Sequence, residues 1–117
     1  MFFKPIKIES KKLRQSARNQ ECTINGPTCN RNRETTVLAH SPFKHLHGGG
    51  TGTKPNDIFA CFACSSCHDA LDGRSSGISK EDRLFYFVKG MSKTWELWVK
   101  MGLIKIEGFK NEKGDVS

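Results

Sequence analysis

The chain has 117 residues, of which 36% are hydrophobic, and its formal net charge is +7 at pH 7. This length has room for one domain, so we expect residues 1–117 to form a single unit with a flexible arm at 1–9 and a flexible tail at 108–117. The sequence has no apolar run long enough for a membrane span, and five cysteines, an odd number, do not suit a closed set of intramolecular disulfides.

The small size and modest apolar content predict a domain that needs a covalent cross-link or a bound metal ion, a staple, to be stable. Ordinary globular domains are about 45–50% apolar, and a short chain buries a smaller share of its surface than a long one. The first residues also lack the apolar stretch of a signal peptide, which favours a cytoplasmic protein. Cysteines stay reduced in that compartment, where clusters of them usually bind metal.

The positive charge is unevenly placed along the chain. Residues 1–54 hold ten Lys and Arg against three acids, whereas the remainder holds nine of each. The excess in the first half favours a polyanionic partner such as DNA. A basic surface that only aids solubility is the alternative.

The first predicted element is a short helix from Ser10 to about Asn19, capped by Ser10. A turn-rich loop over residues 22–29 follows it, because Asn25-Gly26-Pro27 is turn chemistry. The exposed cations of the helix are candidate DNA contacts, and a lysine further along the chain is a candidate phosphate contact. These residues are Lys11, Lys12, Arg14 and Arg18 in the helix and Lys54 beyond it.

Two β-prone segments flank a polar, glycine-rich loop. Residues 35–39 predict a strand that ends at His40, and residues 58–63 predict a second strand. The intervening residues 41–56 make this a hairpin with a long loop, in which we expect His45 and His47 to be solvated.

Two helices and one short apolar segment complete the prediction. A short helix follows Cys67 and reaches about Leu71. Residues 80–101 carry apolar side chains at three- and four-residue steps behind a capping-box-like Ser79–Asp82, which predicts an amphipathic helix. We expect Trp95 and Trp98 of this helix to be in the core rather than to stack on bases. Residues 103–106 are a candidate third strand.

The cysteine spacing predicts a structural zinc site. Zinc is held by four tetrahedral ligands, and a CxxC pair such as Cys64 and Cys67 places two sulfurs on one tight turn. Cys22 and Cys29 are the natural second pair, because the turn residues between them let the loop fold back. Cys61 allows an iron–sulfur interpretation, but a buried free thiol on its strand accounts for it. Cys64–His68 also matches a haem-attachment string, which belongs to exported proteins.

A second group of residues, which are candidates for catalysis, lies close to the predicted zinc ligands. His40 ends the first strand, and His68 and Asp72 share one face of the helix that follows Cys67. A hairpin clamped by zinc to this helix brings an imidazole base and a His/Asp cation site into one cleft, which is the pair that phosphodiester hydrolysis needs. The alternatives are a hydrogen-bonding role for His40 and zinc ligation by His68.

Three strings in order resemble a known family. Leu38–His40, Gly52–Asp57 and Ala63–Asp69 are similar to the YbcO-type prophage nucleases, which are in turn similar to HNH (ββα-metal) endonucleases and to phage recombination nucleases of the Rap/NinG kind. The resemblance implies an α+β fold, namely a small zinc-stapled ββα-metal domain with an added C-terminal amphipathic helix. It also implies a DNA endonuclease that uses Mg²⁺ or Mn²⁺ and acts on branched or recombination intermediates.

The resemblance also implies roles for individual residues. His40 corresponds to the general base and His68 to a ligand of the catalytic cation, while Asn56 or Asp57 fills the middle HNH position. Ala39 stands where many relatives carry a metal-binding acid, so Asp57 or Asp72 has to supply the missing ligand. The rival hypothesis from another functional class is a zinc-stabilised DNA-binding module without catalysis.

Overall fold

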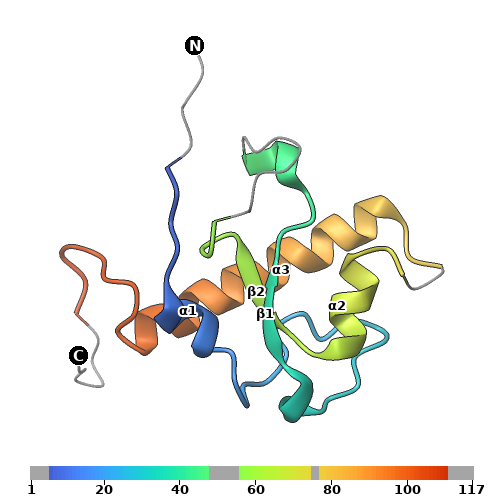
Figure 1. Ribbon diagram of the computed structural model, residues 1–117, viewed down its shortest axis with the longest axis horizontal. Helices are drawn as coiled ribbons and strands as arrows, with labels where there is room; N and C mark the ends of the chain where they lie inside the picture. The colour runs from blue at the N-terminus through green and yellow to red at the C-terminus, as the bar shows by residue number, and fades with distance from the viewer. Residues whose placement is uncertain (1–5, 48–55, 75–76, 111–117) are drawn as a thin grey trace.

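The computed structural model describes residues 6–47, 56–74 and 77–110. Its centre is an antiparallel two-stranded sheet of β1 (Val37–His40) and β2 (Ala60–Ala63), in which Val37 pairs with Ala63 and His40 with Ala60. The helix α2 (Ser65–Leu71) follows β2 directly, and the long helix α3 (Lys80–Lys100) packs against β2 (Figure 1). The predicted α+β class is confirmed, with a sheet of two strands.

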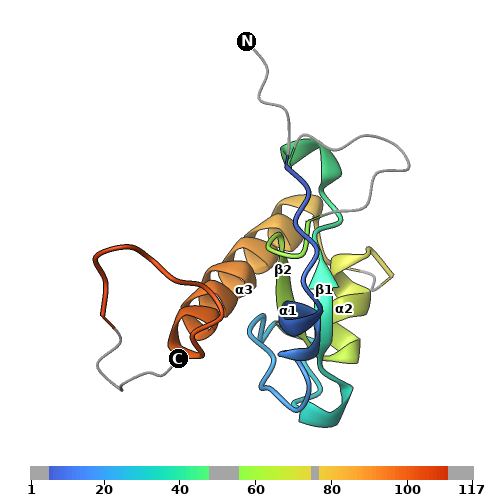
Figure 2. The ribbon, with the colours of Figure 1, turned by 60° about the vertical axis from the view of Figure 1, so that its left-hand side comes forward.

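The first helix is shorter than predicted. α1 covers Lys11–Gln15, and the hydroxyl of Ser10 accepts a hydrogen bond from the Leu13 N–H, as a cap should. The predicted extension to Asn19 is wrong, because the chain turns after Ser16 and Asn19 itself has a positive φ of 60°. α1 lies beside β1, as both views show (Figures 1 and 2).

All four residues of β2 are buried, and among the described residues its outer edge is bonded to Thr23 and Thr94 instead of to a third strand. The Phe62 N–H donates to the Thr94 hydroxyl of α3 at 3.1 Å, and the Phe62 carbonyl accepts from both the N–H and the hydroxyl of Thr23 at 2.8 and 2.9 Å. The two hydroxyls are themselves 3.0 Å apart. These bonds satisfy the buried N–H and carbonyl of Phe62, which would lower the stability of the fold if they had no hydrogen-bond partner.

The long helix begins where its sequence predicts. The Ser79 hydroxyl accepts from the Asp82 N–H, and Phe87, Thr94 and Trp98 form the buried face. Trp98 is in the core as expected, with its ring edge against Phe62. The core position predicted for Trp95 is wrong, since its side chain is 38% exposed and donates its indole N–H to the Ile58 carbonyl at 2.7 Å.

Gly90 is a position where α3 packs closely against the rest of the fold. A Cβ there would lie 2.9 Å from Ile24 Cγ1 and 3.3 Å from Cys61 Cβ. We therefore expect Gly90→Ala to lower the free energy of unfolding, since overpacking costs about 1–3 kcal/mol and outweighs the helix-propensity gain of up to about 1 kcal/mol. Urea denaturation measures this, with the exposed Ser92→Ala as control. A Gly90→Ala protein as stable as wild type would contradict the close packing.

The segment after α3 does not form the predicted strand. The N–H groups of Leu103 and Ile104 both donate to the Trp98 carbonyl, at 2.9 and 3.3 Å, so the chain turns back over the helix end. Gly102, with a φ of 77°, permits this reversal. Leu103 and Ile104 consequently pack against the cluster that contains Trp98.

The arm expected at residues 1–9 is anchored over its described part. The Ile8 N–H donates to Asn56 Oδ1 at 2.7 Å, the Asp57 N–H donates to the Ile8 carbonyl at 3.0 Å, and Asn56 Nδ2 donates to the Ile6 carbonyl. Residues 111–117 of the expected tail are outside the described residues. Among the helices of the described ranges, none has both the length and the apolar character required to cross a bilayer.

Candidate active site and cysteine cluster

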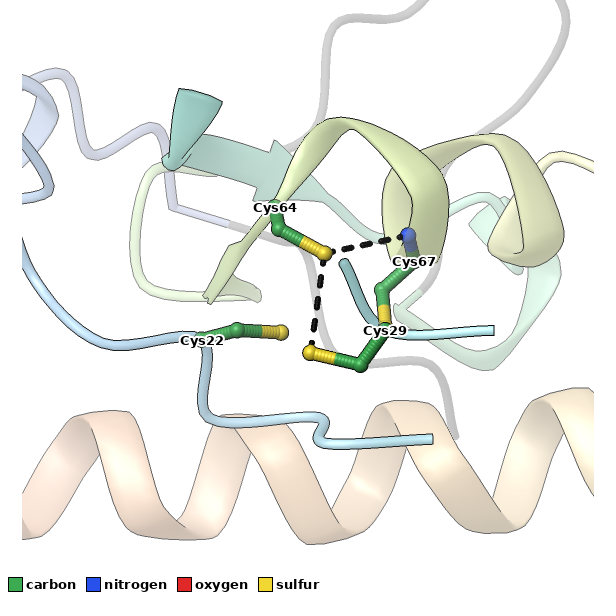
Figure 3. Close-up of side chains that lie close together, drawn as sticks. All are labelled: Cys22, Cys29, Cys64 and Cys67. Atoms are coloured by element: carbon green, nitrogen blue, oxygen red, sulfur yellow. Dashed lines mark hydrogen bonds between the residues drawn. The ribbon is translucent and has the colours of Figure 1, made fainter. Parts of the chain in front are cut away.

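Four cysteine side chains converge beside α2 (Figure 3). The sulfurs of Cys22, Cys29, Cys64 and Cys67 all lie within 4.8 Å of one another. The sulfurs of Cys29 and Cys64 are 3.8 Å apart, which matches the edge of about 3.8 Å in a tetrahedron with Zn–S bonds of about 2.3 Å. The four predicted ligands therefore form one group that could hold a metal ion such as zinc.

Local structure explains how each of the two cysteine pairs, one at the start of α2 and one in the 22–29 loop, is placed in the cluster. Cys64 is the N-cap of α2, and its sulfur accepts from the Cys67 N–H at 3.4 Å, so the CxxC pair lies at the junction of β2 and the helix. In the loop, Asn25 has a φ of 49° and the Cys29 N–H donates to the Gly26 carbonyl. This turn brings Cys22 and Cys29 close together in space, although six residues separate them in the sequence.

The thiols of the cluster differ in pKa. A hydrogen bond from the Cys67 thiol lowers the pKa of Cys22 to about 4, whereas the same bond raises the pKa of Cys67. Burial raises the pKa of Cys29. Zinc binds cysteine in its thiolate form, so a lowered pKa at Cys22 favours metal binding there. Cys61 is outside the cluster and fully buried, and burial raises its thiol pKa, as predicted for a core thiol.

Asp57 is a buried acid just before β2 and is only 3% exposed. Its Oδ1 lies 2.7 Å from His40 Nε2, and its Oδ2 accepts from the Ser10 N–H at 2.6 Å and lies 3.5 Å from Arg14 Nε. Burial raises the pKa of Asp57, but hydrogen bonds from His40 and Ser10 and the charge of Arg14 outweigh burial and leave the pKa below its ordinary value of 3.8. Its ionised form stabilises the fold above that pH, and the stabilisation is lost as the pH falls through the folded-state pKa.

His40 ends β1 with its side chain 31% exposed. The ionised Asp57 carboxylate can only accept hydrogen bonds, so the His40 imidazole donates its Nε2–H to Asp57, and the neutral form of this tautomer carries its lone pair on Nδ1. A histidine fixed in this tautomer is suited to accept a proton at Nδ1.

His68 and Asp72 share one face of α2, as their spacing predicts. His68 Nε2 and Asp72 Oδ2 are 3.6 Å apart, and both side chains are partly exposed. Arg74 also approaches the same Asp72 oxygen at 3.5 Å. Of the two acids expected near His68, the structure places Asp72 beside it and Asp57 beside His40. α2 runs alongside the hairpin in both views (Figures 1 and 2).

The predicted DNA-contacting cations lie on or just after α1. All four side chains are exposed, and Arg14 additionally reaches Asp57; the four are Lys11, Lys12, Arg14 and Arg18. Lys54 is outside the described residues. Sequence reasoning missed the link from Ser10 to Asp57, for which the capping role of Ser10 was the only local signal.

One of the two loop histidines differs from its prediction. His47 is partly buried, its ring stacks on Phe59 at 4.1 Å, and its Nε2 lies 2.8 Å from the Ser41 hydroxyl. Burial lowers the pKa of His47. His45 is exposed, as expected.

The comparisons with known proteins agree on one family. The family described as "Putative nuclease YbcO" matches residues 11–103. Curated proteins of that description from Escherichia coli (strain K12) and Enterobacteria phage 82 are each 46% identical over 98 residues, which is 80% of this chain and 96% of theirs. A solved "putative bacteriophage protein" from Escherichia coli K-12 MG1655 gives a TM-score of 0.65 at 37% identity, over 78% of this chain and 100% of that one. The chain therefore belongs to the YbcO family, in which both of these curated relatives are described as putative nucleases and one of them comes from a phage.

Proposed function

We propose that this chain is a metal-dependent endonuclease that hydrolyses DNA phosphodiester bonds with an HNH (ββα-metal) site. The observation that carries the proposal is the 2.7 Å contact between His40 and the buried Asp57 at the end of a hairpin. The cysteine cluster joins this hairpin to a helix that bears His68 and Asp72. The order β1, β2, α2 supports the same interpretation, as does the family name.

In this proposal His40 is the general base. The attacking water gives its proton to Nδ1, and the oxygen then attacks phosphorus in line with the leaving 3′ oxygen. The negative Asp57 carboxylate stabilises the imidazolium that forms, while its bond to the Ser10 N–H keeps the carboxylate in place. Asp57 is thus a positioning residue and not a metal ligand.

His68 and Asp72 would hold the catalytic cation. Their donor atoms face each other at 3.6 Å across one helical turn, and Mg²⁺ commonly takes one or two protein ligands and keeps several waters. When bound, Mg²⁺ or Mn²⁺ neutralises the phosphate charge and stabilises the leaving oxygen. Arg74, near Asp72, would hold that carboxylate in position.

The cations of α1 would bind the DNA backbone next to this site. The helix is tied to the catalytic residues through Ser10 and Arg14, both of which contact Asp57. Backbone contacts of this kind position the substrate without selecting a sequence. The resemblance of the sequence to phage recombination nucleases favours a substrate formed during recombination, such as branched DNA.

A nicking assay tests the proposal. Purified protein that keeps its tightly bound zinc is incubated with supercoiled plasmid and with a four-way junction, with and without Mg²⁺ or Mn²⁺. We expect cleavage only with the added cation and DNA binding in both conditions. Binding without cleavage of any DNA form in Mg²⁺, Mn²⁺, Ni²⁺ or Zn²⁺ would establish the rival, a zinc-stabilised DNA-binding module.

A further inference from the structure

A second cationic surface lies away from His40, in a groove between residues 20–25 and α3. The groove has a volume of about 450 Å³, and its charged lining residues are Arg33, Lys89, Lys93 and Glu21. Three positive side chains therefore face one carboxylate and Cys22, whose sulfur belongs to the cysteine cluster. Leu97 is the only large apolar side chain among the described residues that line it.

The three cations are arranged along the groove from two elements. Lys89 and Lys93 are one helical turn apart on the same face of α3. Arg33 lies in the 3₁₀ turn at Arg33–Thr35, and its Nε–H donates to the Asn19 carbonyl at 3.0 Å. This bond fixes the guanidinium and uses one of its five donors.

The lysine side chains are exposed and only loosely held. Lys89 Nζ lies 5.8 Å from the centre of the Tyr86 ring, and Lys93 Nζ lies 3.7 Å from an exposed Glu96 oxygen. An exposed ion pair of this length contributes little and is readily exchanged for another anion. The ammonium groups of Lys89 and Lys93 are thus available to bind the phosphates of a nucleic acid.

We propose that this groove is a second site for the phosphate backbone of the nucleic acid that α1 binds. The proposal rests on the proposed function, because it takes a nucleic acid as the substrate. Arg18 and Asn19 come just before the groove residues Gln20 and Glu21, and Asn19 is bonded to Arg33, so the chain leads from the end of α1 directly to the groove. The bound strand contacts both surfaces at once.

The polar lining favours nucleic acid over an acidic protein. Protein interfaces have a largely apolar, often aromatic centre, whereas nucleic-acid interfaces are polar and strongly positive. Leu97 alone does not form such a centre. The groove cations also come from two different parts of the chain, so they are spread along the groove. A nucleic-acid backbone, which carries a phosphate at every nucleotide, can contact cations spread in this way.

A charge-removal experiment tests the groove directly. The triple variant Arg33→Gln, Lys89→Gln and Lys93→Gln is compared with the control Lys44→Gln, Lys80→Gln and Lys105→Gln, which removes equal charge from exposed positions outside the groove. Binding of a 30-base-pair duplex is followed by fluorescence anisotropy without added Mg²⁺, at several salt concentrations. Circular dichroism and zinc content verify that both variants are folded.

We expect the salt slope of log K to be less negative by about 0.9 for each phosphate that the groove variant no longer neutralises. If the groove variant loses contact with three phosphates, its slope changes by about 2.7. Raising the salt from 50 to 200 mM should then reduce the affinity of the wild type by about 40-fold more than it reduces the affinity of the variant. The control should keep a wild-type slope. A groove variant with a wild-type slope, or one that matches the control, overturns the inference and leaves an acidic protein as the ligand class to test.

The outcome is separable from the proposed catalysis. If the groove variant loses salt dependence but wild-type protein cleaves no DNA, the backbone site stands and the endonuclease proposal fails. If both hold, the groove variant should raise KM for plasmid nicking and leave kcat within about twofold, because a loss of uniform binding changes KM alone.

Discussion

His40→Ala is expected to lower the rate of DNA cleavage by about 10²–10⁴-fold, the usual contribution of a general base. The reason is that the variant lacks the Nδ1 lone pair that the contact with Asp57 fixes in place. Single-turnover cleavage of plasmid at saturating protein measures the loss. His40 is outside the cysteine cluster, so the zinc content and the circular dichroism spectrum should match wild type.

The exposed His45 provides a matched control, since His45→Ala removes an imidazole five residues further along the chain that has no role in the proposed mechanism. We expect this control to cleave at the wild-type rate. His68→Ala should differ from both, because raising the Mn²⁺ concentration should restore part of its activity. A His40→Ala protein as active as the control would overturn the assignment of the base, even if the fold and metal sites were correct.

Loss of zinc is expected to unfold the protein at 25 °C. Structural zinc contributes about 10–16 kcal/mol in zinc-finger peptides, which is as large as the whole stability of a typical domain, about 5–15 kcal/mol. The ligands join the 22–29 loop, β2 and α2, so their release separates the elements that form the core. Chelation or Cys64→Ser should abolish the helical circular dichroism signal, and metal analysis of the wild type should give about one zinc per chain.

Cys61→Ala is the control for the zinc prediction. Cys61 is buried beside Gly90 and lies outside the four-sulfur group, so the variant should keep its zinc and its fold at a modest cost in stability. Zinc loss from Cys61→Ala, together with retention in Cys64→Ser, would show that the cysteines are grouped differently.

Features encoded by neighbouring residues were predicted well. The caps at Ser10 and Ser79 start their helices as expected, and the CxxC pair lies at the start of α2. The spacing of His68 and Asp72 placed them on one face, because four residues make about one helical turn. These elements depend on contacts within a few residues, which a sequence displays directly.

Features that depend on distant contacts were predicted less well. Asp57 was a candidate metal ligand, but the choice between His40 and His68 as its neighbour depends on how the chain returns through Ser10. Similarly, residues 103–106 have strand-like composition, yet the Trp98 carbonyl and the surrounding apolar cluster hold them in a turn. The charges of residues 55–117 cancel in sum, which concealed the lysines that face the groove.

The hydroxyls at Phe62 bear on whether a further strand can add to the free edge of β2. A two-stranded sheet normally leaves an open edge, where a strand from another copy can add by main-chain hydrogen bonding. Here the outward N–H and carbonyl of Phe62 are already bonded to Thr94 and Thr23, so an incoming strand would have to displace both threonines. Thr23 and Thr94 thereby occupy this edge of the sheet without the length of chain that a third strand requires.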